Sequence, residues 1–352
     1  MPTIPSDHPP VMPPPAQPYG PVQQPYVPLP PNPAYVAEKR SLRQSANYFG
    51  VAAILYFVVN IAASLFFGFL IQLVYRFTGR HLFGNSEVSY YLLNMGVYML
   101  SFFVSFGAYL LFLKMPWKAA VPFRPVRIEK VLLSIPATFA FSVVGSILTS
   151  ILALLFSITG YQPVTSDIQL PVTVPGTVLY FVLLAVLPPV FEEIAFRGIL
   201  MQSLRRFGDG FALLISAIIF GLFHLNMVQA PYAFLLGLWF GYLVLRTGSL
   251  RISMALHACV NLSAGVMSFL MEGMTEQTLV IVNLIYIVFW ILTGVASFLF
   301  LILRTRGPLG LYPARTLMRT GQKMGTYFSS VAMILALLAI LYFMIQNFER
   351  VA

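Results

Sequence analysis

The chain has 352 residues, of which 59% are apolar and only 9% are charged, and its mean hydropathy is +0.83. Soluble globular proteins carry about 25% charged residues, so this composition excludes a soluble globule and predicts a polytopic membrane protein. The net charge of +10 does not indicate a nucleic-acid partner, because the basic residues lie in short clusters between apolar runs, where they are typical of a topological signal.

Residues 1–34 contain 14 of the 26 prolines, interleaved with Gln and Tyr. Such a stretch cannot build a core, so we expect an extended, disordered cytoplasmic tail over residues 1–40, with a proline-motif docking role as the alternative to an inert spacer. The tail has no apolar run behind a basic start, so we expect no cleavable signal peptide. Cys259 is the single cysteine, which excludes an intrachain disulfide.

Apolar segments long enough to suggest membrane helices follow the tail along the whole chain. They lie at residues 48–76, 89–113, 130–159, 176–204, 211–226, 231–246, 251–271, 277–303 and 326–347. The fifth and sixth are short and could be tilted, broken or partly re-entrant. The sequence therefore predicts an all-α, polytopic membrane helix bundle of about nine transmembrane helices, divided into N-terminal helices (41–174), a core (175–271) and C-terminal helices (272–352).

Lysines and arginines occur before the first segment and in the even-numbered connections, at residues 39–43, 114–130, 205–206, 246–251 and 304–323. The odd-numbered connections contain only Arg80. This alternation predicts that the N-terminus and the even-numbered connections are cytoplasmic, and that the C-terminal Glu349-Arg350 lies outside.

Glu192-Glu193-x-x-x-Arg197 lies inside one apolar helical stretch. Charge in hydrocarbon is costly, so such residues usually mark a site. Glu193 and Arg197 are four residues apart and share a helix face, whereas Glu192 and Arg197 diverge by about 140°. Glu193 therefore has a built-in partner, and Glu192 must find its partners on other helices. The preceding Pro188-Pro189 removes two backbone donors, so the helix is expected to kink or begin afresh there.

Two further motifs place polar groups inside apolar segments, Phe220-x-x-x-His224 and His257-x-x-x-Asn261. A buried carboxylate, two imidazoles and an amide can activate water, move a proton and stabilise an oxyanion. That is the inventory of a hydrolase with no side-chain nucleophile. The alternative is a buried polar network that fixes helix packing. Cys259 is interpreted as a packing residue, and no Gly-x-Ser-x-Gly elbow surrounds a serine.

In order and spacing, the three motifs resemble those of the CPBP family, which includes CAAX prenyl endopeptidases and bacterial proteins linked to bacteriocin self-immunity. The resemblance covers roughly residues 175–270. It implies an intramembrane glutamic-type endopeptidase in which Glu192 is the general base assisted by His224, and His257 and Asn261 form the oxyanion hole. Glu193, Arg197 and Phe220 would then be structural or supporting residues, and no cofactor or metal would be required.

Alternatives remain open. Glu192, His224 and His257 could be the three ligands of a catalytic zinc. A catalytically idle scaffold or immunity protein would use the same fold for binding, and a secondary transporter would show inverted repeats, which are not evident. Expected partners are the lipid bilayer and a membrane-associated peptide or protein substrate, with no nucleic acid. The expected location is a bacterial plasma membrane, and the sequence encodes neither the substrate nor the oligomeric state.

Depth is a difficulty for a single site. Counting ~1.5 Å per helical residue, Glu192 is ~21 Å along its helix from Arg206, whereas His257 is only ~9 Å from Arg251. Tilt, a kink or a re-entrant segment must bring these side chains to one level if they act together.

Overall fold

The computed structural model describes residues 32–81, 83, 86–163, 169–303, 311–312 and 315–350. The described chain is almost wholly helical, which confirms the all-α bundle. The helices outside the central span are α1 (Pro33–Thr78), α2 (Ser86–Leu113), α3 (Trp117–Ala120), α4 (Ile128–Ile158), α8 (Asp209–Leu222), α9 (Ala230–Thr247), α10 (Leu250–Met271), α11 (Glu276–Leu303), α12 (Thr320–Phe328) and α13 (Val331–Gln346).

The central span is an unbroken run of helix over Val174–Phe207 with several helix types. It consists of α5 (Val174–Phe181), the π-helical η1 (Val182–Val186), α6 (Leu187–Glu192), the π-helical η2 (Glu193–Leu200), α7 (Met201–Leu204) and the 3₁₀ turn η3 (Arg205–Phe207). Pro188 and Pro189 lie in the first turn of α6, so the expected disturbance takes the form of a π turn before the prolines. A second π-helical stretch begins at the glutamate pair, and π turns are frequent at functional sites.

Among the described residues, six helices are long and apolar enough to cross a membrane: α1, α2, α4, the central span, α10 and α11. A seventh crossing results if α12 and α13, which are bent by 73°, count as one broken span. Helix α8 is shorter than a full span, because it ends after 14 residues. The protein is therefore a multi-pass membrane protein, but the predicted count of nine spanning helices is not confirmed.

Helix α1 begins earlier than the sequence indicates. The Asn32 side chain accepts a hydrogen bond from the Ala34 amide and Pro33 occupies the first turn, an arrangement that starts helices well. Residues 33–40 of the predicted tail are thus helical. The rest of the predicted tail, residues 1–31, lies outside the described residues.

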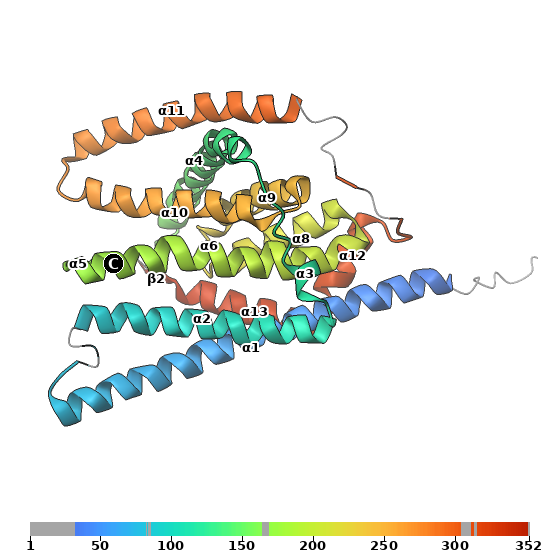
Figure 1. Ribbon diagram of the computed structural model, residues 1–352, viewed down its shortest axis with the longest axis horizontal. Coiled ribbons are helices and arrows are strands. Elements are labelled where there is room, and N and C mark those ends of the chain that lie inside the picture. Colours follow the sequence, from blue (N-terminus) through green and yellow to red (C-terminus); the bar gives the residue numbers. More distant parts are fainter. Residues whose placement is uncertain are drawn as a thin grey trace, which may run out of the picture.

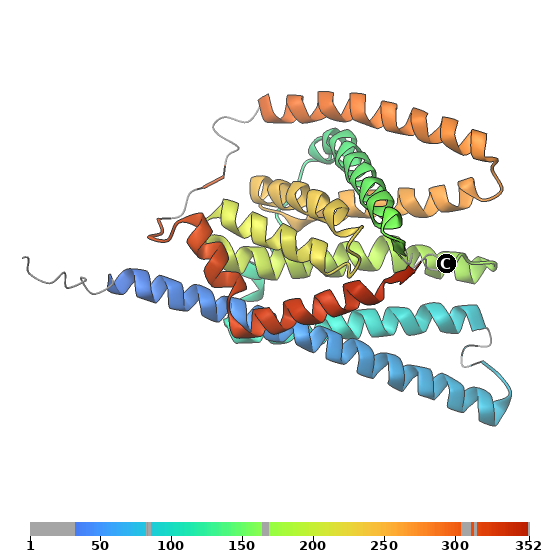
Figure 2. The same ribbon diagram turned by 180° about the vertical axis from the view of Figure 1, so that it is seen from behind.

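The connections separate into two ends of the bundle, visible at right and left in Figure 1 and from behind in Figure 2. At the end with α3 and α12, Arg206 donates to Ser45, and the Leu250 amide donates to the Pro122 carbonyl. At the opposite end, β1 (Tyr161–Pro163) pairs antiparallel with β2 (Phe348–Arg350). The basic connections thus lie together, away from the C-terminal strand.

Candidate functional site

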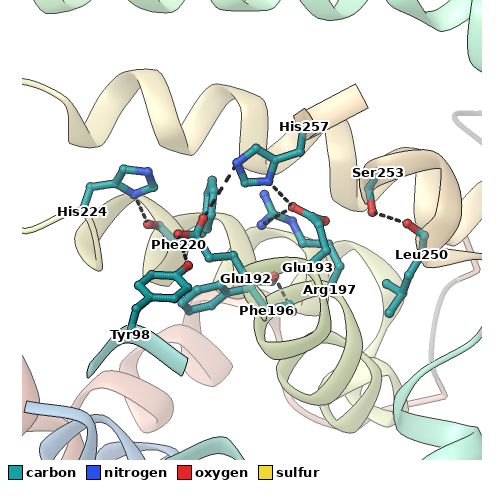
Figure 3. A network of polar contacts seen from close by, with 11 residues as sticks. Tyr98, Glu192, Glu193, Phe196, Arg197, Phe220, His224, Leu250, Ser253 and His257 are labelled. Carbon is teal, nitrogen blue, oxygen red and sulfur yellow. Dashed lines mark hydrogen bonds and ion pairs between the residues drawn. The ribbon is translucent and has the colours of Figure 1, made fainter. Parts of the chain in front are cut away.

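Side chains from four parts of the chain meet around the glutamate pair (Figure 3). Glu192 ends α6 and Glu193 begins η2, while His257 comes from α10. Tyr98 comes from α2, and His224 lies two residues beyond Leu222, the last residue of α8. The site is therefore assembled from distant segments, and its geometry depends on how those helices are staggered.

A close backbone approach at Gly198 sets this stagger. A Cβ atom on Gly198 would lie 2.9 Å from the Ala120 carbonyl oxygen and 3.4 Å from Cδ1 of Leu250, so α3 and the start of α10 are level with Gly198. At ~1.5 Å per residue, Glu192 is then ~9 Å deeper than Gly198, and His257 is ~10 Å deeper than Leu250. The two side chains reach the same level because Ala120 and Leu250, both buried, pack beside Gly198 and not at the end of the central span.

Glu193 and Arg197 form the predicted ion pair. Oε1 of Glu193 lies 3.1 Å from Nη1 of Arg197, and both side chains are completely buried. The guanidinium carbon also lies 3.8 Å from the centroid of the Phe220 ring and 5.6 Å from that of Phe240. The cation is thus covered by aromatic faces, which attract it strongly in a desolvated site, and Phe220 supports Arg197 directly.

His257 lies between the two glutamates. Its Nδ1 is 3.1 Å from Oε1 of Glu193, and its Nε2 is 3.9 Å from Oε2 of Glu192. The imidazole stacks on Phe240, with ring centroids 5.4 Å apart at 27°. The spacing of the motif predicts only Arg197 as a partner of Glu193. The structure shows that this carboxylate also holds His257, and so fixes which nitrogen of the ring faces Glu192.

Glu192 differs from its neighbour in exposure and in partners. Its side chain is 16% exposed, whereas that of Glu193 is fully buried. The Tyr98 hydroxyl donates to Oε1 of Glu192 over 2.9 Å. No motif around Tyr98 distinguishes it from the other 17 tyrosines of the chain, so sequence reasoning could not have selected it. Glu192 is the carboxylate that water can reach.

The two histidines of the motifs contact one phenylalanine ring. The Phe220 centroid lies 4.9 Å from the His224 ring and 6.0 Å from the His257 ring, each with edge-to-face geometry. Nδ1 of His224 lies 2.9 Å from the Phe220 carbonyl oxygen. A carbonyl only accepts, so Nδ1 carries the proton, and the other nitrogen, Nε2, is left as a proton acceptor.

Asn261 has a structural partner in the central span. Its side-chain nitrogen donates to the Leu184 carbonyl over 2.9 Å. In an α-helix this carbonyl would accept from residue 188, and in a π-helix from residue 189. Both are prolines without an N–H, so Leu184 has no backbone donor in either register. Asn261 supplies the missing donor and retains its second amide hydrogen for another acceptor.

Comparison with known proteins agrees with the motifs. Residues 174–263, about a quarter of the chain, match a family model described as type II CAAX prenyl endopeptidase Rce1-like. These residues form an Rce1-like segment. The resemblance indicated by the three motifs is thereby confirmed, and the family is one of proteases. The chain matches no curated protein and no solved structure significantly.

The Rce1-like segment holds every site residue that the sequence selected, from Glu192 to Asn261, but not Tyr98. Helix α2 therefore contributes a contact to the glutamate from outside the matched region. Across the described part of the chain, no group of three or more His, Cys, Asp or Glu side chains has the arrangement of a metal site. A chelation experiment tests whether Glu192 and the two histidines bind zinc.

Proposed function

We propose that the protein is an intramembrane glutamic-type endopeptidase that hydrolyses a peptide bond of a membrane-associated protein or peptide. The contrast between the paired glutamates supports this proposal most directly. Glu193 is buried against Arg197 and His257, whereas Glu192 remains partly exposed beside Nε2 of His257 and the Tyr98 hydroxyl. One carboxylate is fixed as part of the scaffold, and the other is placed to meet a water molecule.

In the proposed mechanism, Glu192 removes a proton from water, assisted by His224, and the water oxygen attacks the scissile carbonyl carbon. The resulting tetrahedral oxyanion accepts hydrogen bonds from His257 and Asn261. When the C–N bond breaks, the proton held by Glu192 passes to the leaving amine. Water is thus added across the amide with no covalent enzyme intermediate.

The contact with Glu193 sets the orientation of His257 in this mechanism. A carboxylate only accepts hydrogen bonds, so the proton between His257 and Glu193 resides on Nδ1. Nε2 can then donate to an oxyanion only if the ring is an imidazolium. Glu193 therefore acts on His257 by position, because its contact with Nδ1 leaves Nε2 as the nitrogen that faces Glu192.

The orientation in the membrane is also part of the proposal. The basic connections lie at one end of the bundle, and the positive-inside rule assigns that end to the cytoplasm. The N-terminus would then be cytoplasmic and β2 extracytoplasmic, in the plasma membrane of a bacterial cell.

The decisive experiment compares membranes from cells that produce the wild-type protein with membranes from cells that produce Glu192→Gln at equal levels. Mass spectrometry of new protein termini should reveal products that depend on Glu192. Identical termini in the two membranes would contradict the peptidase and favour a binding protein of the same fold. A farnesylated CAAX peptide, the substrate type in the description of the matched family, tests whether the purified protein shares that substrate. The bacterial location proposed above predicts that this peptide is not cleaved.

A further inference from the structure

A basic cavity of about 870 Å³ lies at the end of the bundle that carries α3. Four cationic side chains line it: Lys118 and Arg124 from the connection between α2 and α4, Arg205 from η3, and Arg246 from the last turn of α9. No Asp or Glu is among its lining residues in the described chain. Three separate parts of the fold thus direct positive charge into one space.

This charge is only partly neutralised. Arg205 pairs with Asp209, with Nε 2.8 Å from Oδ1. In the described ranges, neither Lys118 nor Arg124 has a carboxylate within ion-pair distance. Like charges gathered in one cavity repel each other and attract an anion. A phosphate group suits them, because its several oxygens accept charge-assisted hydrogen bonds from more than one cation.

An apolar cavity of about 320 Å³ adjoins the basic one, and the two share Arg246 and Thr247 as lining residues. Its walls include Trp239 and Leu243 of α9 and Leu301 of α11. The basic cavity and the apolar cavity thus lie on either side of Arg246. Together they fit an amphiphile whose headgroup lies beside the cations and whose acyl chain lies between α9 and α11.

The aromatic residues nearby place the pair of cavities at a membrane surface. Trp117 is 54% exposed, and Phe123, which lines the basic cavity, is 42% exposed. Trp117 lies four residues after α2 ends at Leu113, and exposed tryptophan near the end of a membrane helix is typical of the interface where lipid headgroups lie. A lipid is therefore within reach of this site without leaving its leaflet.

We propose that an anionic phospholipid binds here, with its headgroup phosphate in the basic cavity and one acyl chain in the apolar cavity. The site lies apart from Glu192 and does not depend on the proposed peptidase activity. Lipid binding would fix the connection between α2 and α4 against the ends of η3 and α9.

The test uses the full chain in detergent, with phosphatidylglycerol and phosphatidylcholine titrated separately and the bound lipid counted by native mass spectrometry. We expect phosphatidylglycerol to bind at least tenfold more tightly, and Arg124→Gln and Arg246→Gln each to weaken it about tenfold, since each removes a charge-assisted hydrogen bond. Arg43→Gln is the matched control, because it removes one exposed charge from α1 at the same end without lining the cavity. Equal binding of the two lipids, or an equal loss in the control, would overturn the proposal.

A second arm separates a lipid from a soluble phosphate. Leu301→Trp, which narrows the apolar cavity, should weaken phosphatidylglycerol but leave glycerol 3-phosphate unaffected. If glycerol 3-phosphate binds as tightly as the lipid, the ligand is a soluble phosphate and the lipid assignment is wrong. Thermal unfolding of each variant shows whether the protein remains folded, so that a loss of binding reports on the site.

Discussion

Nδ1 of His257 lies 3.1 Å from Oε1 of Glu193, and the same carboxylate oxygen lies 3.1 Å from Arg197. One buried carboxylate thus holds a cation within its own helix and a histidine from another helix. Removing its charge should leave Arg197 buried without a counter-ion, which typically costs about 3–5 kcal/mol.

We therefore expect Glu193→Gln to lower the unfolding temperature and the yield of folded protein. Replacing both partners with neutral residues, as in Glu193→Gln with Arg197→Met, should restore most of the stability, because no uncompensated charge remains. Activity should stay low in this double variant, since His257 still lacks its carboxylate. Thermal unfolding and cleavage assays measure the two effects separately, and a double variant with wild-type activity would refute the role of Glu193 in holding His257.

Tyr98→Phe tests whether α2 positions the proposed base. The substitution removes one hydroxyl and its hydrogen bond to Glu192 while keeping the ring contacts with Phe102 and Phe191. We expect near-normal stability and a kcat lowered about tenfold, because a hydrogen bond to a charged group contributes about 1.5–3 kcal/mol. KM should change little. A raised KM with a normal kcat would instead place Tyr98 in substrate binding.

Chelation distinguishes the two mechanisms for activating water. If Glu192 and His224 act directly on water, treatment with EDTA or phenanthroline followed by dialysis should leave the cleavage rate nearly unchanged. Complete inhibition that is reversed by added zinc would instead establish the metal mechanism, with Glu192, His224 and His257 as ligands. Metal analysis of the purified protein provides an independent measurement.

Local features of the site could be predicted from the sequence. The Glu193–Arg197 pair follows from a spacing of four on one helix, and the common end of the basic connections follows from the positive-inside pattern. The Tyr98 contact could not be predicted, because it joins helices 94 residues apart and tyrosine is common in this chain. The depth of His257 in the bundle could not be predicted either, because it depends on how the connection between α2 and α4 packs beside Gly198.

That connection leads to a prediction at Gly198. A Cβ atom there would lie 2.9 Å from the Ala120 carbonyl oxygen, closer than side chains approach backbone. Gly198→Ala should therefore push α3 and the start of α10 away from η2, lower the unfolding temperature and reduce activity by displacing His257. Gly210→Ala is the control, since its Cβ would meet nothing within 4 Å, and alanine favours a helix over glycine by about 1 kcal/mol. Equal stability of the two variants would contradict the close approach.

The last prediction concerns Asn261 and Pro188, which are linked through the Leu184 carbonyl. Asn261→Ala removes the donor that this carbonyl lacks within its own helix, and an unsatisfied buried acceptor costs about 1–3 kcal/mol. Pro188→Ala restores a backbone N–H that can reach Leu184 in an α-helical register. The cost of Asn261→Ala should thus be smaller in the Pro188→Ala background, which a double-mutant cycle of unfolding free energies can measure.

The same cycle separates the structural role of Asn261 from its proposed catalytic role. If its second amide hydrogen also stabilises the oxyanion, the double variant should recover stability but remain ~10²–10³-fold slower than the wild type. Recovery of both stability and rate would show that Asn261 serves only to satisfy the Leu184 carbonyl, and the oxyanion hole would then need another donor beside His257. Strictly additive free energies would instead show that the prolines and Asn261 are not coupled, contrary to the geometry of the helix.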